Sequence, residues 1–276
     1  MALPVYVINL ARAPERLAGI EGQLKRLEVA WQRVDAIDRK TVDADAVRGE
    51  FGASRLSRSF PATLGDICCS LSHRRVWEML LASGAESAVV LEDDALLSAS
   101  FGKLVCSDLH GLLMRHQLGV LKLEHWPGPQ QSRRIPLGEP FGPVLGHADI
   151  NVYQMRSSFL GTCGYVISAE AVRTVLGRFP QMQVPVDHYL FGAAARMGFD
   201  LIRPGFLNPA PVLHGVDRFG SDIRDEREAG GQVGGPRTLG RKMRDWSERR
   251  REARELRRGE AERVEMRFAE DAFGMP

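Results

Sequence analysis

The feature that most constrains the fold is the opening of the chain, which follows the order strand, helix, strand. Val5–Ile8 is a short apolar run rich in β-formers, typical of a strand buried on both faces. The next stretch has Pro14 near its start, where proline suits a first helical turn, and apolar residues at helical spacing: Leu17, Ile20, Leu24 and Leu27. A second strand is predicted around residues 31–34. This order predicts a β-α-β unit, and therefore parallel strands in an α/β fold.

Bulk composition limits the classes of protein to consider. The 276 residues are 44% hydrophobic and 26% charged, which excludes overall disorder and allows one α/β domain with an appendage. The net charge of +2 gives no global attraction to nucleic acid, so we expect no nucleic-acid partner. The four cysteines form no C-x-x-C pair, and no basic leader or apolar run of about 18 residues occurs. These features predict a cytoplasmic protein.

An acidic cluster follows the apolar strand that the sequence predicts at residues 88–91. Thr63 and Asp66 have capping-box spacing and introduce a helix that should end at Gly84. Residues 88–91 then form an apolar strand, and Glu92, Asp93 and Asp94 follow directly. Open α/β sheets bind ligands at the carboxyl ends of their strands, so the position of these carboxylates indicates a ligand-binding site.

The remaining elements are predicted from punctuation and spacing. We expect a helix over residues 100–116, a strand at 120–123, and no regular structure from 125 to 151, where proline and glycine recur. Regular structure should resume over residues 159–167, followed by a helix capped by Ser168 and a helix from Asp187. The predicted division is an α/β domain, residues 1–228, followed by a Gly-rich linker and an Arg/Glu-rich helical tail, residues 229–276.

The acidic cluster alone allows two interpretations of equal weight. Carboxylate oxygens are ligands for Mg²⁺ or Mn²⁺, and the phosphates of a nucleotide can complete the coordination. Solvated carboxylates in a turn or a helix cap would have the same sequence, because acidic triplets are common.

Several ordered blocks distinguish the interpretations. The Glu92–Asp94 cluster, with Val90 and Leu91 before it, resembles the acidic motif of glycosyltransferase family 25, the lipopolysaccharide and collagen galactosyltransferase-like group. The segment 65–73 is similar to the Gly-Glu-x-Gly-Cys-x-x-Ser-His block, with Asp66 and Cys68 in place of the usual Glu and Gly. Arg39 also departs from the pattern, since Gly often follows the Val-Asp-Ala block. The other matching blocks are Val7–Leu10 with Arg12 and Arg16, Val34–Ala36, Gly161–Ser168 and Pro185–Asp187.

The resemblance implies a GT-A type fold, in which a Rossmann-like mixed sheet flanked by helices joins a nucleotide-sugar-binding half to an acceptor-binding half. It also implies inversion at the anomeric carbon. Such a reaction needs a base for the acceptor proton and positive charge beside the leaving phosphates.

By the same resemblance, Asp94 and Asp93 would bind the metal, while Glu92 and Asp93 would lie near the ribose or bound waters. His214 is the candidate late-chain ligand, since imidazole suits manganese. An ordinary loop histidine is an equally good interpretation of His214.

The remaining site residues also have structural alternatives. Asp187 is the candidate base, although Asp is also a common helix N-cap. Three residues would contact the nucleotide after the first strand, although exposed helix arginines are commonplace: Asn9, Arg12 and Arg16. His73 would lie near the donor or, alternatively, on a helix surface.

The resulting functional expectation is an inverting glycosyltransferase using Mn²⁺ or Mg²⁺ and a nucleotide sugar. The donor usual for the family is UDP-galactose, and the acceptor would be a glycan, lipid-linked in a lipopolysaccharide-type pathway. The alternatives are an inactive nucleotide-sugar-binding scaffold and a metal-dependent phosphohydrolase. A phosphohydrolase with a two-metal site would need additional His/Asp ligand motifs, which this sequence lacks.

The tail suggests a further partner, the anionic inner surface of a membrane. Basic clusters surround Arg249 and Arg257, and four apolar residues could add contacts if they share a face: Trp246, Leu256, Val264 and Phe268. Interleaved glutamates could cancel this attraction by pairing along the helix: Glu248, Glu252, Glu255 and Glu260.

Overall fold

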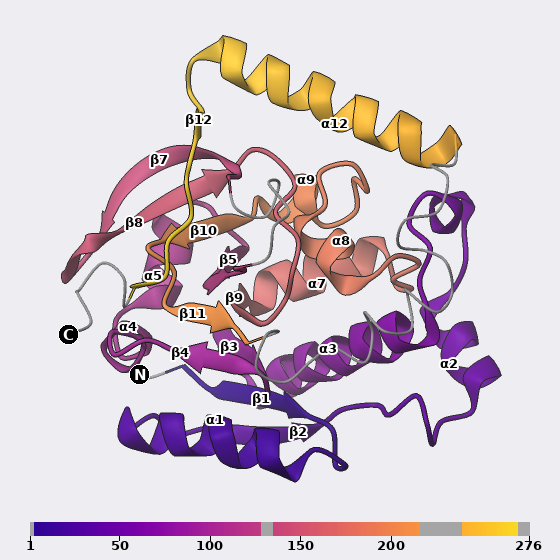
Figure 1. The fold of residues 1–276 in the computed structure, drawn as a ribbon, viewed down its shortest axis with the longest axis horizontal. Coiled ribbons are helices and arrows are strands. Elements are labelled where there is room, and N and C mark those ends of the chain that lie inside the picture. Colours follow the sequence, from indigo (N-terminus) through magenta and orange to yellow (C-terminus); the bar gives the residue numbers. More distant parts are fainter. Residues whose placement is uncertain (1–2, 128–134, 216–238, 270–276) are drawn as a thin grey trace.

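A nine-stranded mixed sheet organises the molecule (Figure 1). The computed structural model describes residues 3–127, 135–215 and 239–269. In spatial order the strands are β12 (Glu262–Arg263), β7 (Leu137–Val144), β8 (His147–Met155), β10 (Gly205–Asn208), β5 (Val120–Lys122), β9 (Gly164–Ser168), β3 (Ser87–Glu92), β1 (Val5–Asn9) and β2 (Gln32–Asp35).

The opening β-α-β unit has formed as predicted. β1 pairs in parallel with both β2 and β3, and α1 (Pro14–Arg26) connects β1 to β2. β9 then runs antiparallel between β3 and β5, which makes the sheet mixed. The expected α/β class and the mixed sheet flanked by helices are therefore confirmed.

The two faces of the sheet bury separate cores, because alternate residues of each strand point to opposite faces. In β1, Tyr6 and Ile8 belong to one core, while Val5 and Val7 belong to the other. The helices of the Tyr6 face are α2 (Ala44–Phe51), α3 (Leu64–Ser83), α7 (Ala169–Arg178), α8 (Val186–Phe191) and α9 (Phe199–Ile202). Those of the Val7 face are α1, α4 (Phe101–Val105) and α5 (Leu109–Arg115).

A second, three-stranded sheet adjoins the acidic end of β3. Its strand order is β4 (Ala95–Leu97), β11 (Val212–His214) and β6 (Glu124–His125). β4 follows the Glu92–Asp94 cluster directly, and β11 pairs His214 with Ala95. The small sheet thus brings a late segment of the chain to the end of β3.

Local capping signals determine the helix boundaries where the sequence predicted them. Thr63 and Asp66 form a reciprocal capping box at the start of α3, and Gly84 ends the helix in the left-handed conformation. Ser168 caps α7 by accepting from Ala171 N. The single helix expected over 100–116 is instead α4 and α5, because Asp108 caps a new helix at Leu109. A short 3-10 helix, η1 (Arg55–Arg58), precedes α3.

The prediction of irregular structure over 125–151 was wrong for its second half, where β7 and β8 form a long antiparallel hairpin. Prolines 140 and 143 are tolerated because register shifts fall beside them, between Pro140 and Gly142 and between Pro143 and Val144. On its other side β7 pairs with β12 only at Leu137 and Gly138. Pro140 and Pro143 therefore have no neighbouring strand on that side, and their missing N–H groups cost no hydrogen bond there.

The C-terminal region contains the expected helix, α12 (Leu239–Arg258), which lies along one side of the molecule (Figure 1). After α12 the chain returns to the body as β12, and Val264, Met266 and Phe268 are buried there. The predicted Gly-rich linker lies outside the described residues. No helix in the described ranges is long and apolar enough to cross a membrane.

Candidate functional site at the end of strand β3

Three carboxylates leave the end of β3 toward different partners. Asp93 is nearly buried and lies between the ends of β1 and α1. Its Oδ2 accepts from Asn9 Nδ2 at 2.8 Å, and its Oδ1 pairs with Arg16 Nη1 at 3.3 Å. Burial raises the pKa of Asp93, with Asn9 and Arg16 opposing the shift. The predicted Asn9 and Arg16 therefore do meet the acidic cluster.

Arg12, in contrast, pairs through its Nε with Asp38 Oδ2 at 2.8 Å, in the loop after β2. The Arg12 side chain is 32% exposed. The structure thus places the predicted Arg12 at the loop that follows β2.

Glu92 is held by helix α3 and by the loop before β9. His73 Nε2 lies 3.2 Å from Glu92 Oε1, and Thr162 Oγ1 donates to the same oxygen at 2.7 Å. Burial alone would raise the pKa of Glu92, but His73, His214 and Thr162 together lower it to about 2. Glu92 is therefore ionised at neutral pH and oriented by its hydrogen bonds with His73 and Thr162.

A buried hydrogen-bond chain orients His73. Trp77 Nε1 donates to Tyr165 OH at 2.9 Å, and Tyr165 OH lies 2.9 Å from His73 Nδ1. Because indole can only donate, the tyrosine proton is directed at Nδ1, and Nε2–H then points to Glu92. His73 is fully buried, so the alternative of a helix-surface pair was wrong.

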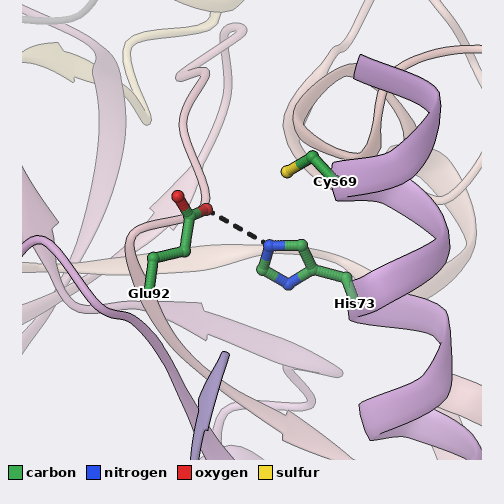
Figure 2. A group of neighbouring side chains, drawn as sticks. All are labelled: Cys69, His73 and Glu92. Carbon is green, nitrogen blue, oxygen red and sulfur yellow. Dashed lines mark hydrogen bonds and ion pairs between the residues drawn. The ribbon is translucent and has the colours of Figure 1, made fainter. Parts of the chain in front are cut away.

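Cys69, one helical turn before His73, completes a small group with Glu92 in which one ligand atom of each lies within 4.8 Å of the others. Figure 2 shows the thiol and the imidazole leaving the same side of α3 toward the carboxylate. This group adjoins the end of β3.

Asp94 faces the small sheet. Its Oδ2 lies 3.7 Å from His214 Nε2, and Cys163 Sγ donates to its Oδ1 at 3.5 Å. Burial raises the pKa of Asp94 to about 6, and the neighbouring Glu92 and Asp93 charges act in the same direction. His214 is the last residue of β11 and is not a loop residue. The structure thus brings the two predicted metal ligands Asp94 and His214 together.

The residues around Asp94 fit a divalent cation. Ligand atoms of Asp94, Cys163 and His214 lie within 4.8 Å of one another, and His214 Nδ1 is buried without a hydrogen-bond partner among the described residues. Burial and nearby carboxylates raise the pKa of the Cys163 thiol well above its usual value, so Cys163 is a neutral neighbour. Asp94 and His214 supply the charged oxygen and the nitrogen suited to Mn²⁺.

Asp187 is placed by α3 rather than by β3. It lies in the first turn of α8, and the preceding Val186 N donates to Ser70 Oγ of α3 at 3.0 Å. The predicted helix start is confirmed to within one residue. Pro185 occupies the N-cap position and Asp187 Oδ1 accepts from His188 N, so the N-cap interpretation of Asp187 was wrong.

A model of glycosyltransferase family 25 (LPS biosynthesis protein) matches residues 2–190. The chain belongs to glycosyltransferase family 25. The matched region includes every candidate site residue except His214.

Two curated relatives illustrate the range of the family. The chain is 29% identical over 194 residues to procollagen galactosyltransferase 1-B of Xenopus laevis, covering 67% of this chain and 30% of that protein. It is 34% identical over 199 residues to the inactive glycosyltransferase 25 family member 3 of Mus musculus, covering 67% and 31%. This family 25 chain therefore spans about three tenths of the length of the curated relatives it matches.

Among solved structures, a glycosyltransferase involved in glycosylation of the major capsid of PBCV-1 matches with a TM-score of 0.39 and 10% identity, over 84% of this chain and 100% of that chain.

Several contacts of this family 25 site were not predicted. Thr162, Cys163 and Tyr165 reach it from the segment 161–168, and Cys69 reaches it from α3. Both segments had been noted as family-like blocks, which was the available signal. The buried Lys122–Glu124 ion pair beneath Gly161 had no such signal.

Proposed function

We propose that this chain is an inverting glycosyltransferase that transfers a sugar, galactose from UDP-galactose, to a hydroxyl group of a glycan acceptor. The observation that carries the proposal is the convergence of Asn9, Arg16, His73 and His214 on three adjacent carboxylates at a strand end. A site of this kind has both oxygen ligands and positive charge where a nucleotide diphosphate would meet the sheet.

In the proposed reaction an acceptor oxygen forms a bond to the anomeric carbon while the bond from that carbon to the diphosphate oxygen breaks. The nucleoside diphosphate leaves with the electron pair, and the acceptor proton passes to the Asp187 carboxylate. Asp187 is partly exposed in the first turn of α8, where a hydroxyl group can approach it.

The donor would be held by groups of opposite character. Arg16 and Arg12 offer guanidinium groups to the phosphates, and Glu92, made rigid by His73 and Thr162, offers an acceptor for ribose hydroxyls or waters. Asp94, Asp93 and His214 would hold Mn²⁺ or Mg²⁺, which supplies positive charge beside the leaving phosphates.

The acceptor that we propose is a lipid-linked glycan of lipopolysaccharide or another surface polymer. The description of the matching family model, an LPS biosynthesis protein, supports this class. Procollagen, named for the Xenopus relative, is the competing acceptor type.

A second candidate is a nucleotide-sugar-binding scaffold without turnover, because a relative at 34% identity is named inactive. A product assay distinguishes the two. The purified protein is incubated with UDP-galactose, manganese and glycan acceptors, and transfer of labelled sugar supports the enzyme. Donor-dependent thermal stabilisation without transfer to any acceptor would favour the scaffold.

A further inference from the structure

The described part of α12 separates its charges by sign. From Lys242 to Arg258, all four acidic residues are buried or partly buried: Asp245, Glu248, Glu252 and Glu255. Six basic residues are exposed: Lys242, Arg249, Arg250, Arg254, Arg257 and Arg258. The helix therefore presents positive charge outward although its sequence interleaves both signs.

Specific contacts account for the positions of the acids. Glu248 Oε1 accepts from Ser158 Oγ at 2.8 Å, and Glu255 pairs with Arg258 at 3.3 Å. Asp245 pairs with Arg244, and Glu252 pairs with Arg263 beyond the helix. Among the described residues these pairs engage only Arg258 of the six exposed basic residues, which leaves the positive charge of the other five uncancelled.

The inner side also fixes α12 to the body. Arg244 Nη1 donates to Ser59 O at 3.1 Å, and its guanidinium lies over the Phe60 ring. Two turns further along, Arg251 pairs with Asp200 at 3.0 Å and lies over the Phe199 ring. The outer side is consequently held in one orientation before any partner binds.

Apolar side chains lie among the outward arginines. Met243 is 61% exposed and Trp246 is 54% exposed. Spacings of three and four residues place them on one helical face with three arginines, and we call this set the outer face of α12: Met243, Trp246, Arg250, Arg254 and Arg257. Arg250 lies over the Trp246 ring at 4.6 Å. Two of the apolar residues that the sequence suggested for this role, Val264 and Phe268, are buried in the body instead.

We infer that the outer face of α12 docks on an anionic phospholipid surface. Guanidinium groups attract lipid phosphates, while Trp246 and Met243 can enter the interface between headgroups and acyl chains. A nucleic acid would use the arginines but would gain nothing from Met243, so the combination favours a bilayer. Figure 1 shows α12 at the edge of the molecule with its outer side uncovered by any drawn element. The inference goes beyond the proposed transfer reaction and does not depend on it.

The test is sedimentation of the full chain with phosphatidylglycerol-containing vesicles and with pure phosphatidylcholine vesicles. Each basic residue at an anionic surface contributes about fivefold in partitioning, so Arg250→Gln/Arg254→Gln/Arg257→Gln should lower binding about 100-fold. The matched control is Lys25→Gln/Arg26→Gln/Lys103→Gln, which removes the same charge from the exposed surfaces of α1 and α4 and should retain binding. Thermal unfolding should be similar for both triple variants.

Tryptophan emission gives an independent signal. Trp77 and Trp126 are buried and Trp31 is partly buried, so a blue shift on addition of anionic vesicles would report Trp246. The shift should disappear in Trp246→Phe. The inference would be overturned if the two triple variants bound anionic vesicles equally, or if the wild type bound neutral and anionic vesicles equally. It would also be overturned if the wild type sedimented with anionic vesicles without a change in tryptophan emission.

Discussion

At the residue scale, Asp94 is the group on which metal dependence should turn. Asp94→Asn keeps the shape of the side chain and removes a charge that burial already disfavours, so folding should be preserved. We expect donor turnover to fall at least about 100-fold because the amide is a poor ligand for a hard cation. Turnover is measured over a manganese titration, with the exposed Asp45→Asn as control. Full activity in chelator would contradict metal dependence.

Asp187 should separate donor binding from transfer. Asp187 is not the N-cap of α8, so Asp187→Asn should cost little stability while removing the proposed base. The variant is expected to keep its donor-induced thermal shift and to lose about 100-fold or more in turnover. Donor binding and transfer are measured on the same preparation. Normal turnover in the variant would restrict Asp187 to a structural role.

At the element scale, Glu248 makes the packing of α12 against the protein body dependent on pH. Burial raises its pKa, because the carboxylate lies against the body beside Ser158. The pKa of Glu248 is therefore higher in the folded protein than in the unfolded chain. At pH values around these two pKa values the native state binds more protons than the unfolded state. The contribution of Glu248 to the free energy of unfolding therefore increases as the pH falls through this range.

Glu248→Gln retains an acceptor for Ser158 and removes the buried charge. We therefore expect the variant to unfold at an equal or higher temperature than the wild type at neutral pH, with the difference shrinking toward acid pH. Thermal melts across pH measure this, and Glu252→Gln, which removes the Arg263 pair, is the control on the same helix. A marked destabilisation by Glu248→Gln would show that the charge itself is required.

At the scale of the whole molecule, a buried ion pair joins the two sheets. Lys122 of β5 and Glu124 of β6 lie 2.9 Å apart with both side chains fully buried. Lys122 Nζ also donates to Gly161 O, and Glu124 accepts from Gly164 N at 3.3 Å. The pair thereby supports the segment that carries Thr162 to Glu92 and Cys163 to Asp94.

Removing one partner should leave an uncompensated buried charge. Lys122→Met is expected to cost about 3–5 kcal/mol of unfolding free energy, whereas Lys122→Met/Glu124→Leu should recover much of that loss. Chemical denaturation of both variants measures the difference. A double variant as unstable as the single one would show that packing, and not the unpaired charge, causes the loss.

The sequence by itself determined the features that depend on a few neighbouring residues. Thr63, Gly84 and Ser168 set helix ends through hydrogen bonds and backbone conformations made within one turn. The apolar run before Glu92 placed the carboxylates at a strand end, and ordered motifs indicated the family.

Only the tertiary structure decided which distant groups meet. His73 reaches Glu92, and His214 reaches Asp94, because the sheets bring α3 and β11 to the end of β3. The prolines of β7 became part of a strand because the hairpin accommodates register shifts, which local propensity does not reveal. The charge of α12 faces outward for a related reason, since Ser158 and the rest of the body determine which side of the helix is covered. Such outcomes depend on packing between remote segments, and that packing is a property of the complete fold.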